Sequence, residues 1–291
     1  MSYDSLCCFR NSSEEKYRIL CEIISACNQK CNFCHFHGKD KMSIENVRVI
    51  LDNLRDLPIK DIILTGGEPL LHNDLFKIMD EIKQQGYNVD ICTNGSLINS
   101  KNVKKLSNYL SEISISLDTS DPRMYELIRG ANHYERVINS ITILVNAGVE
   151  VHLTCVINKH NINEIEELIR VASLSGVNSI NFLGLMTGIA NDKVSANNIL
   201  INSVEETLII EQIHNYRKKY AININTKRIV SKEEKNGCRA GENILGITCA
   251  GQLVSCIMHD RSRSIDIINT STSIRDVKEI LSCVGNVCVQ Q

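Results

Sequence analysis

Several kinds of residue are scarce in this sequence. Tryptophan is absent, aromatic residues make up only 4% of the chain, and there are three prolines among 291 residues. The core must therefore come mainly from Ile, Leu and Val, and the apolar fraction of 43% is enough to build one. No Pro-rich linker divides the chain. We therefore expect one large domain with at most a small addition.

Excess charge and long hydrophobic runs are also missing. The net charge is −2 and no Lys/Arg run is large enough to change this balance, so we predict no binding to nucleic acid or to an anionic membrane. No apolar stretch is long enough to cross a bilayer. The polar N-terminus, Met1–Arg18, lacks the hydrophobic centre of a signal peptide. These absences predict a cytoplasmic protein.

Cysteine, in contrast, is abundant. The chain holds 13 cysteines, and nothing in the sequence indicates export. In a reducing cytosol such a count favours metal ligation over disulfides, and an odd number cannot pair completely. Most of the cysteines fall in two groups, one near residue 30 and one beyond residue 237. The sequence therefore predicts two metal sites.

Residues 18–186 alternate β-rich runs with amphipathic helical patterns. The predicted strands are Ile19–Ser25, Asp61–Thr65, Asn88–Thr93, Ile113–Asp118, Glu150–Ile157 and Ser179–Leu183. The predicted helices between them include Ile44–Arg55, Asp74–Gln85, Glu135–Ala147 and Ile162–Ser175. This alternation is typical of parallel strands covered by helices. Six such units predict an α/β fold, a partial (β/α)6 TIM-like barrel, with its chemistry at the C-terminal ends of the strands.

The remainder of the chain changes character. Residues 187–237 are predicted to be mostly helical, with Ile199–Tyr220 as the clearest helix. Leu245–Thr248 and Leu253–Cys256 flank a Gly-containing turn and predict a hairpin. Ser273 is predicted to cap a helix that runs to Leu281. The expected organisation is an N-terminal extension (1–17), the barrel with its connecting helices (18–237) and a small C-terminal domain (238–291).

Three closely spaced cysteines follow the first predicted strand directly. Cys27, Cys31 and Cys34 lie on one short loop. Three thiolates in this arrangement can hold three irons of a [4Fe–4S] cluster and leave the fourth iron open. The alternative is a zinc site completed by His35 or His37.

The spacing C-x3-C-x-aromatic-C, with Phe33 before the last cysteine, resembles the signature of the radical S-adenosylmethionine (SAM) superfamily. The resemblance implies that Cys27, Cys31 and Cys34 hold the cluster beside Phe33 and that SAM binds the open iron. An electron, expected from flavodoxin or ferredoxin, would then cleave SAM to a 5′-deoxyadenosyl radical. The sequence Gly66-Gly67-Glu68 after the second predicted strand resembles the family segment that binds the SAM amino group, where glycine lets backbone and ligand approach closely.

Further SAM-pocket candidates follow other predicted strands. Along the fourth strand, Ile113, Ile115 and Leu117 alternate with Ser114, Ser116 and Asp118, so the polar residues are predicted to face the barrel interior. The resemblance implies that Ser116 and Asp118 reach the SAM ribose and that Arg129 pairs with the SAM carboxylate. A solvated helix residue is the alternative for Arg129. The additional candidates are Asn94 and Asn158.

The cysteines outside the two groups are interpreted as packed thiols. On the fifth predicted strand, Cys155 takes the face opposite Glu150, His152 and Thr154, which favours burial in the core. The same interpretation is given to Cys7, Cys8, Cys21 and Cys92.

The C-terminal cysteines resemble the auxiliary-cluster module of the SPASM/twitch group. This resemblance implies a small auxiliary iron–sulfur domain in which four thiolates hold a second [4Fe–4S] cluster. The alternative is a zinc ribbon, which usually shows two C-x-x-C pairs that are missing here. The stretch Gly246–Cys256 also resembles the GTP cyclase of cofactor synthesis, which uses three cysteines and leaves an iron to its substrate. The four ligand candidates are Cys238, Cys256, Cys283 and Cys288.

Cys249 lies in the predicted hairpin and is surplus to this set. A thiol has a weak S–H bond and can donate a hydrogen atom to a carbon radical, which would invert the carbon if the donor is on the face opposite abstraction. This arrangement resembles neomycin C epimerase, a radical SAM enzyme that inverts one carbon of an aminoglycoside. The alternatives are a buried hairpin thiol, or a ligand that replaces one of the C-terminal pair.

Three enzymatic functions are consistent with these motifs. The first is epimerisation of an amino sugar or aminoglycoside, with Cys249 as hydrogen donor and with Glu22 and Glu150 facing substrate ammonium groups. The second is dehydrogenation of an aminocyclitol or alcohol, with the auxiliary cluster accepting an electron. The third is peptide modification. A non-enzymatic iron–sulfur or zinc protein would leave the Gly-Gly-Glu and Ser-x-Asp motifs unexplained.

Overall fold

The fold is built on one ten-stranded sheet with the strand order β10-β9-β8-β1-β2-β3-β4-β5-β6-β7. The computed structural model describes residues 16–34, 38–185, 199–227, 244–257 and 264–270, and Val277. From β8 to β7 all neighbouring strands are parallel, whereas β9 and β10 are antiparallel. The strands are β1 (Tyr17–Ile24), β2 (Ile59–Gly66), β3 (Asn88–Thr93), β4 (Leu110–Ser116), β5 (Glu150–Ile157), β6 (Ser179–Gly184), β7 (Asn223–Lys227), β8 (Ile244–Ile247), β9 (Gln252–Val254) and β10 (Ser264–Asp266).

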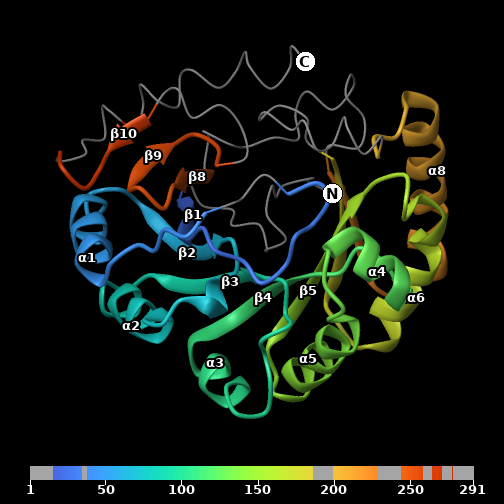
Figure 1. The fold of residues 1–291 in the computed structure, drawn as a ribbon, viewed down its shortest axis with the longest axis horizontal. Coiled ribbons are helices and arrows are strands. Elements are labelled where there is room, and N and C mark those ends of the chain that lie inside the picture. Colours follow the sequence, from blue (N-terminus) through green and yellow to red (C-terminus); the bar gives the residue numbers. More distant parts are fainter. Residues whose placement is uncertain are drawn as a thin grey trace.

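Helices cover the outer side of the curved sheet (Figure 1). They are α1 (Ile44–Asn53), α2 (Leu75–Gln84), α3 (Val103–Tyr109), α4 (Pro122–Arg129), α5 (Tyr134–Asn146), α6 (Ile165–Leu174) and α8 (Ser203–Lys219), with short 3-10 turns η1 (Pro69–Leu71) and η2 (Ile162–Glu164). Each βα connection returns the chain to the next parallel strand, so the C-terminal ends of the strands meet at one edge of the sheet.

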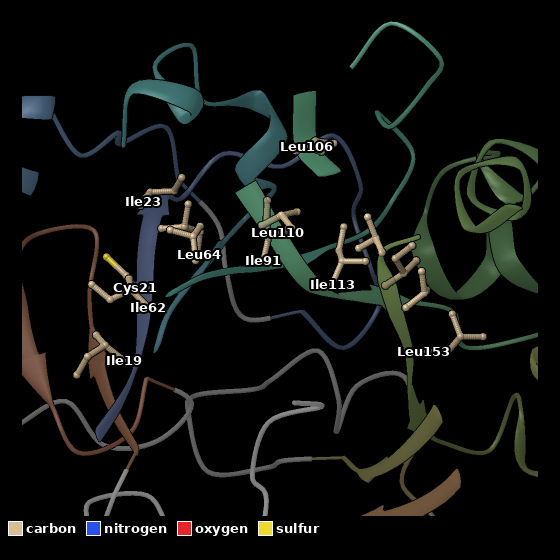
Figure 2. Packing of buried hydrophobic residues seen from close by; sticks show 14 of the residues in the cluster. Ile19, Cys21, Ile23, Ile62, Leu64, Ile91, Leu106, Leu110, Ile113 and Leu153 are labelled. Atoms are coloured by element: carbon tan, nitrogen blue, oxygen red, sulfur yellow. The ribbon is translucent and has the colours of Figure 1, made fainter. Parts of the chain in front are cut away.

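The hydrophobic core lies between the sheet and these helices. Figure 2 shows Ile19 and Ile23 of β1 beside Ile62 and Leu64 of β2, all almost completely buried. The predicted alternation in β4 is confirmed, because its apolar residues Ile113, Ile115 and the following Leu117 are inaccessible to solvent. Two predicted packed thiols are confirmed in the same core, Cys21 and Cys155. Cys92 packs on Ile63, and Cys7 and Cys8 lie outside the described residues.

All six predicted strands are present, and their ends differ from the prediction by at most three residues. The prediction that residues 187–237 are mostly helical is wrong for Asn223–Lys227, which form β7 and pair in parallel with β6. This edge strand has a weak pattern because four of its five residues are polar, while Ile224 is buried in the core. Two short helices, α3 and α4, are not among the helices named from the sequence, although a helical position was the alternative for Arg129.

The predicted hairpin is confirmed by the pairs Gly246–Val254 and Ile247–Leu253. Its first strand, β8, also pairs in parallel with β1, so the hairpin extends the barrel sheet across the predicted boundary at residue 238. The boundary itself stays a prediction. The helix expected from Ser273 to Leu281 lies outside the described residues except for Val277. Within the described part of the chain, no helix is both long and apolar enough to span a membrane.

Candidate active site

The cysteine loop, Cys27–Cys34, begins just after the C-terminal end of β1. Its three cysteines are buried or half-buried, and none forms a disulfide. N–H groups face two of the sulfurs: the Gln29 backbone and the Asn94 amide donate to Cys27 Sγ at 3.4 Å and 3.9 Å, and Arg129 Nη1 donates to Cys31 Sγ at 3.7 Å. Such donors stabilise thiolate ligands of iron. The loop therefore fits a [4Fe–4S] cluster.

The zinc alternative needs a ligand beyond the three cysteines. Zinc needs four ligands around one point. Among the residues that the structure describes, no three His, Cys, Asp or Glu side chains converge in this way. Cysteines of an iron–sulfur cube bind different irons, so they need not converge on one ion. The described residues thus give the zinc alternative no support, while His35 and His37 lie outside them.

Two glycines let the end of β2 close against the end of β1. Gly66 has a φ of +129°, and a Cβ atom there would lie 2.1 Å from the Ile24 oxygen; a Cβ atom at Gly67 would lie 2.2 Å from the Ala26 oxygen. The Gly67 N–H donates to Ile24 O at 2.7 Å. The close approach in this structure is therefore between two backbones, whereas approach to the SAM amino group stays a prediction.

Glu68 ties the ends of three segments together. Its carboxylate is completely buried and accepts hydrogen bonds from the Thr93 hydroxyl (2.7 Å), the Asn94 N–H (2.8 Å) and the Leu70 N–H (3.0 Å). Burial raises the pKa of Glu68, and these three bonds act in the opposite direction. The Asn94 amide also donates to Asn28 Oδ1 at 2.8 Å, so Glu68 and Asn94 connect β2 and β3 with the cysteine loop.

The C-terminal end of α4 docks on the same loop. Asp121 caps the start of α4 by accepting from the Arg123 and Met124 N–H groups. At the other end, the Lys30 N–H donates to Arg129 O at 3.0 Å and the Asn32 N–H donates to Ile128 O at 2.9 Å. The left-handed residue Gly130 (φ +64°) ends the helix there. Helix α4 therefore positions the loop through backbone contacts.

Asp118 and Arg129 form a buried ion pair, with 2.6 Å between Asp118 Oδ2 and Arg129 Nε. Asp118 Oδ1 also accepts from the Val156 N–H at 2.8 Å. Burial raises the pKa of Asp118, and Arg129 opposes this shift. The alternative of a solvated helix residue is wrong for Arg129, which is 6% exposed and lies over the Phe33 ring at 5.6 Å. The predicted contacts of Phe33, Asp118 and Arg129 with SAM stay predictions.

The remaining SAM-pocket candidates lie at the same edge of the sheet. Ser116 is half-buried at the end of β4. Asn158, completely buried after β5, donates to Val156 O at 3.0 Å and accepts from the His160 N–H at 2.9 Å. Its side chain thus holds the loop after β5. A role of Ser116 or Asn158 toward SAM is still a prediction.

Cys249 lies in the tight turn between β8 and β9. The turn is closed by the Gly251 N–H, which donates to Thr248 O at 2.8 Å. The Cys249 N–H donates to the carboxylate of Glu22 in β1 at 3.3 Å. The thiol is half-buried, and burial, then Asp40 and Glu22, raise its pKa to about 11. Cys249 is therefore a protonated thiol at neutral pH, next to the strand that leads into the cysteine loop.

The candidate auxiliary ligands are only partly described. Cys256 is half-buried and lies two residues beyond β9. Cys238, Cys283 and Cys288 lie outside the described residues, so the second cluster stays a prediction. The substrate candidate Glu150 opens β5 directly opposite Glu112 of β4.

Sequence reasoning missed two buried residues that support the loop. Gln29, between the first two cysteines, donates from its amide to the Tyr125 hydroxyl at 2.8 Å, and both residues are almost completely buried. Gln29 could have been identified from the sequence, because it is a polar residue inside the cysteine motif. Tyr125 gave no such indication, because its hydroxyl meets the loop only when α4 is in place.

Comparisons with known proteins agree with this geometry. The model of the Radical SAM superfamily matches residues 21–172. The chain is 28% identical over 260 residues to a probable GTP 3',8-cyclase of Sulfurisphaera tokodaii, covering 85% of this chain and 82% of that protein. It is 30% identical to a probable GTP 3',8-cyclase of Saccharolobus solfataricus, covering 89% of each.

Solved structures share the fold at lower sequence identity. Streptococcus suis SuiB bound to S-adenosylmethionine superposes with a TM-score of 0.73 at 18% identity and covers 88% of this chain. The match spans 64% of the SuiB chain. The enzyme anSMEcpe with bound AdoMet gives a TM-score of 0.71 at 15% identity, covering 91% of this chain and 77% of its own. With the family model matching more than half of its length, this chain belongs to the radical SAM superfamily.

Proposed function

We propose that this enzyme is an epimerase in which Cys249 returns a hydrogen atom to a substrate carbon radical. The observation that carries this proposal is the position of Cys249 in the β8–β9 turn, held by Glu22 of β1. When bound, a [4Fe–4S] cluster on Cys27, Cys31 and Cys34 together with SAM supplies a radical that removes hydrogen from carbon. Cys249 and the cysteine loop lie at the same edge of the sheet, because β8 and β1 are parallel neighbours.

The protonation state of Cys249 supports this role. A hydrogen-atom donor must carry its S–H bond. A pKa of about 11, raised by burial and by the nearby Asp40 and Glu22, keeps the thiol protonated. In the step, the S–H bond breaks, a C–H bond forms and a cysteinyl radical remains. One electron from a flavodoxin or ferredoxin and one proton restore the thiol.

The substrate class proposed for this reaction is an amino sugar or aminoglycoside. Glu22 of β1 accepts the Cys249 N–H and therefore places a carboxylate beside the proposed hydrogen donor. Carboxylates favour ammonium groups by charge. Glu22 is accordingly the proposed contact to substrate, whereas Glu150 opens β5 at the end of the strand away from the cysteine loop.

Solvent deuterium tests the hydrogen-donor role. In D2O the Cys249 thiol exchanges its proton, so we expect one deuterium at the inverted carbon of each product molecule. An inverted product without solvent deuterium would exclude a thiol donor. A product two mass units lighter, without inversion, would indicate dehydrogenation instead.

Substitution of Cys249 provides the second test. Cys249→Ala removes the S–H bond, so inversion should stop while SAM cleavage continues. Cys92→Ala is the matched control, because Cys92 is also a half-buried thiol but lies on β3 and packs on Ile63. Undiminished epimerisation by Cys249→Ala would contradict the proposal, as would equal loss in the control.

A second [4Fe–4S] cluster on Cys238, Cys256, Cys283 and Cys288 is part of the proposal. Iron analysis of the Cys27→Ala/Cys31→Ala/Cys34→Ala protein should still find about four irons per chain. A Cys256→Ala protein should retain the cluster on Cys27, Cys31 and Cys34. Iron-free protein after the triple substitution would refute the second cluster.

Cyclisation of a GTP-like substrate is a second candidate. It is supported by the two archaeal relatives named probable GTP 3',8-cyclase, which match at 28% and 30% identity over most of both chains. Anaerobic incubations with SAM, reductant and either GTP or an amino sugar distinguish the cyclase from the epimerase. SAM cleavage that depends on GTP and yields an isomer of GTP would favour the cyclase, whereas cleavage that depends on an amino sugar would favour the epimerase.

A further inference from the structure

Arg129 occupies an unusual place for a charged residue. Its side chain is almost completely buried, and its guanidinium contacts a carboxylate on one side and a cysteine sulfur on the other. The carboxylate is that of Asp118, 2.6 Å from Nε, and the sulfur is that of Cys31, 3.7 Å from Nη1. A guanidinium is planar and has five N–H groups in a fixed fork. The contact of Nε with Asp118 therefore fixes the direction in which Nη1 points toward Cys31.

Asp118 is itself fixed by the sheet. Its second oxygen accepts the Val156 N–H of β5 at 2.8 Å, and Asp118 lies two residues beyond the end of β4. The Phe33 ring lies 5.6 Å from the guanidinium carbon. Arg129 is also anchored through its backbone, because its carbonyl accepts the Lys30 N–H at 3.0 Å. Both ends of Arg129 are therefore held relative to the cysteine loop.

We propose that Arg129, oriented by Asp118, donates an N–H···S hydrogen bond to Cys31 and thereby makes the cluster bound there easier to reduce. Reduction adds a negative charge to the cluster, and much of that charge resides on the sulfurs. A positive hydrogen-bond donor in a buried site stabilises the reduced form more than the oxidised form. Arg129 acts in this way as a positioning residue that tunes the cluster, whichever substrate the enzyme uses.

The decisive measurement is a redox titration of the reconstituted full-length protein without SAM. The relevant EPR signal is the one that disappears in the Cys27→Ala/Cys31→Ala/Cys34→Ala protein. We expect Arg129→Gln to lower the ratio of reduced to oxidised cluster about tenfold at a fixed potential. This change corresponds to a midpoint potential that is lower by about 59 mV for one electron. Arg129→Lys, which keeps the charge but loses the fork, should give a smaller decrease.

Arg18 offers a matched control. It is also a buried arginine, paired with Asp61 at 2.9 Å, but it lies near the start of β1, at the end of the strand away from the cysteine loop. Arg18→Lys should therefore leave the ratio of reduced to oxidised cluster unchanged. A change in Arg18→Lys as large as that in Arg129→Gln would overturn the proposal, because it would show a general effect of disturbing the fold.

Pulsed EPR separates a hydrogen bond from general structural support. Wild-type protein moved into D2O should show an exchangeable deuteron coupled to the reduced cluster, and this coupling should be lost or weakened in Arg129→Gln. If Arg129→Gln does not retain iron, the titration and the deuteron measurement are made on Arg129→Lys. An unchanged potential together with an unchanged deuteron coupling in the variant that retains iron would overturn the proposal.

Discussion

Gly130 packs against the backbone carbonyl of Lys30 so closely that a Cβ atom at Gly130 would lie 2.6 Å from that oxygen. The contact joins the end of α4 to the middle of the cysteine loop. It is reinforced by the Lys30 N–H, which donates to the carbonyl of the neighbouring Arg129 at 3.0 Å. The geometry of the cluster-binding loop therefore depends on a helix that begins much later in the chain, after β4.

The first prediction concerns Gly130→Ala. Alanine must adopt a left-handed conformation at φ +64° and must also displace Lys30, so we expect lower stability and reduced iron content. Gly148→Ala is the control, because Gly148 has a φ of +78° but nothing within 4 Å of the position that a Cβ atom would take. It should cost only about 1–2 kcal/mol and leave iron content unchanged. Equal iron content in both variants would contradict a role of this contact in holding the loop.

The second prediction concerns Glu68→Gln. The carboxylate accepts three hydrogen bonds in a buried site, and an amide must present an NH2 group to at least one of those donors. We expect a loss of about 1–3 kcal/mol in the free energy of unfolding, measured by urea denaturation under argon. Glu81→Gln, which removes an ion pair to the exposed Arg48, should cost much less than Glu68→Gln, because solvent screens an exposed pair. Similar losses in the two variants would argue against Glu68 as a buried connector.

The third prediction is a pH dependence caused by Asp90 in β3. Burial first, then Glu112 and Asp61, raise the pKa of Asp90 from 3.8 to about 7, while Arg18 opposes the shift. Because the folded protein holds this proton more tightly than the unfolded chain, the contribution of Asp90 to stability is complete below pH 3.8 and is lost as the pH rises through about 7. We expect Asp90→Asn, which stays neutral, to gain about 1–3 kcal/mol relative to wild type between pH 5 and pH 8.

Urea unfolding of wild type and Asp90→Asn at pH 5 and pH 8 measures this difference. Glu112 is one of the carboxylates that raise the pKa of Asp90 and lies 3.2 Å from His152, so Glu112→Gln serves as a second variant. Identical pH dependence in wild type and Asp90→Asn would show that Asp90 does not carry the effect.

The fourth prediction concerns Tyr125→Phe. Loss of the hydroxyl leaves the buried Gln29 amide without its acceptor, so we expect a cost of about 1–2 kcal/mol and faster loss of iron to a chelator. Tyr109→Phe makes the same chemical change at an exposed bond to Asp80 and should alter neither measurement appreciably. Equal rates of iron loss in the two variants would count against support of the cysteine loop by Tyr125.

Local patterns in the sequence determined much of the fold by themselves. The six strands Ile19–Ser25 through Ser179–Leu183 were predictable because β-rich runs and amphipathic helices alternate with clear periodicity. The positions of the cysteine loop and of Gly-Gly-Glu followed, because the ends of parallel strands meet at one edge. The family resemblance also rests on these local motifs, and the match over residues 21–172 confirms it.

Tertiary structure alone decided which of these residues contact one another. Asp118 and Arg129 were both assigned to SAM from their motifs, yet they form an ion pair, because α4 returns its last turn to the end of β4. Strand β7 was missed because an edge strand with four polar residues out of five carries little hydrophobic pattern. The contact of Cys249 with Glu22 joins residues 227 positions apart and depends on β8 pairing with β1. Sequence periodicity reports burial along one segment, whereas such contacts depend on how separate segments pack.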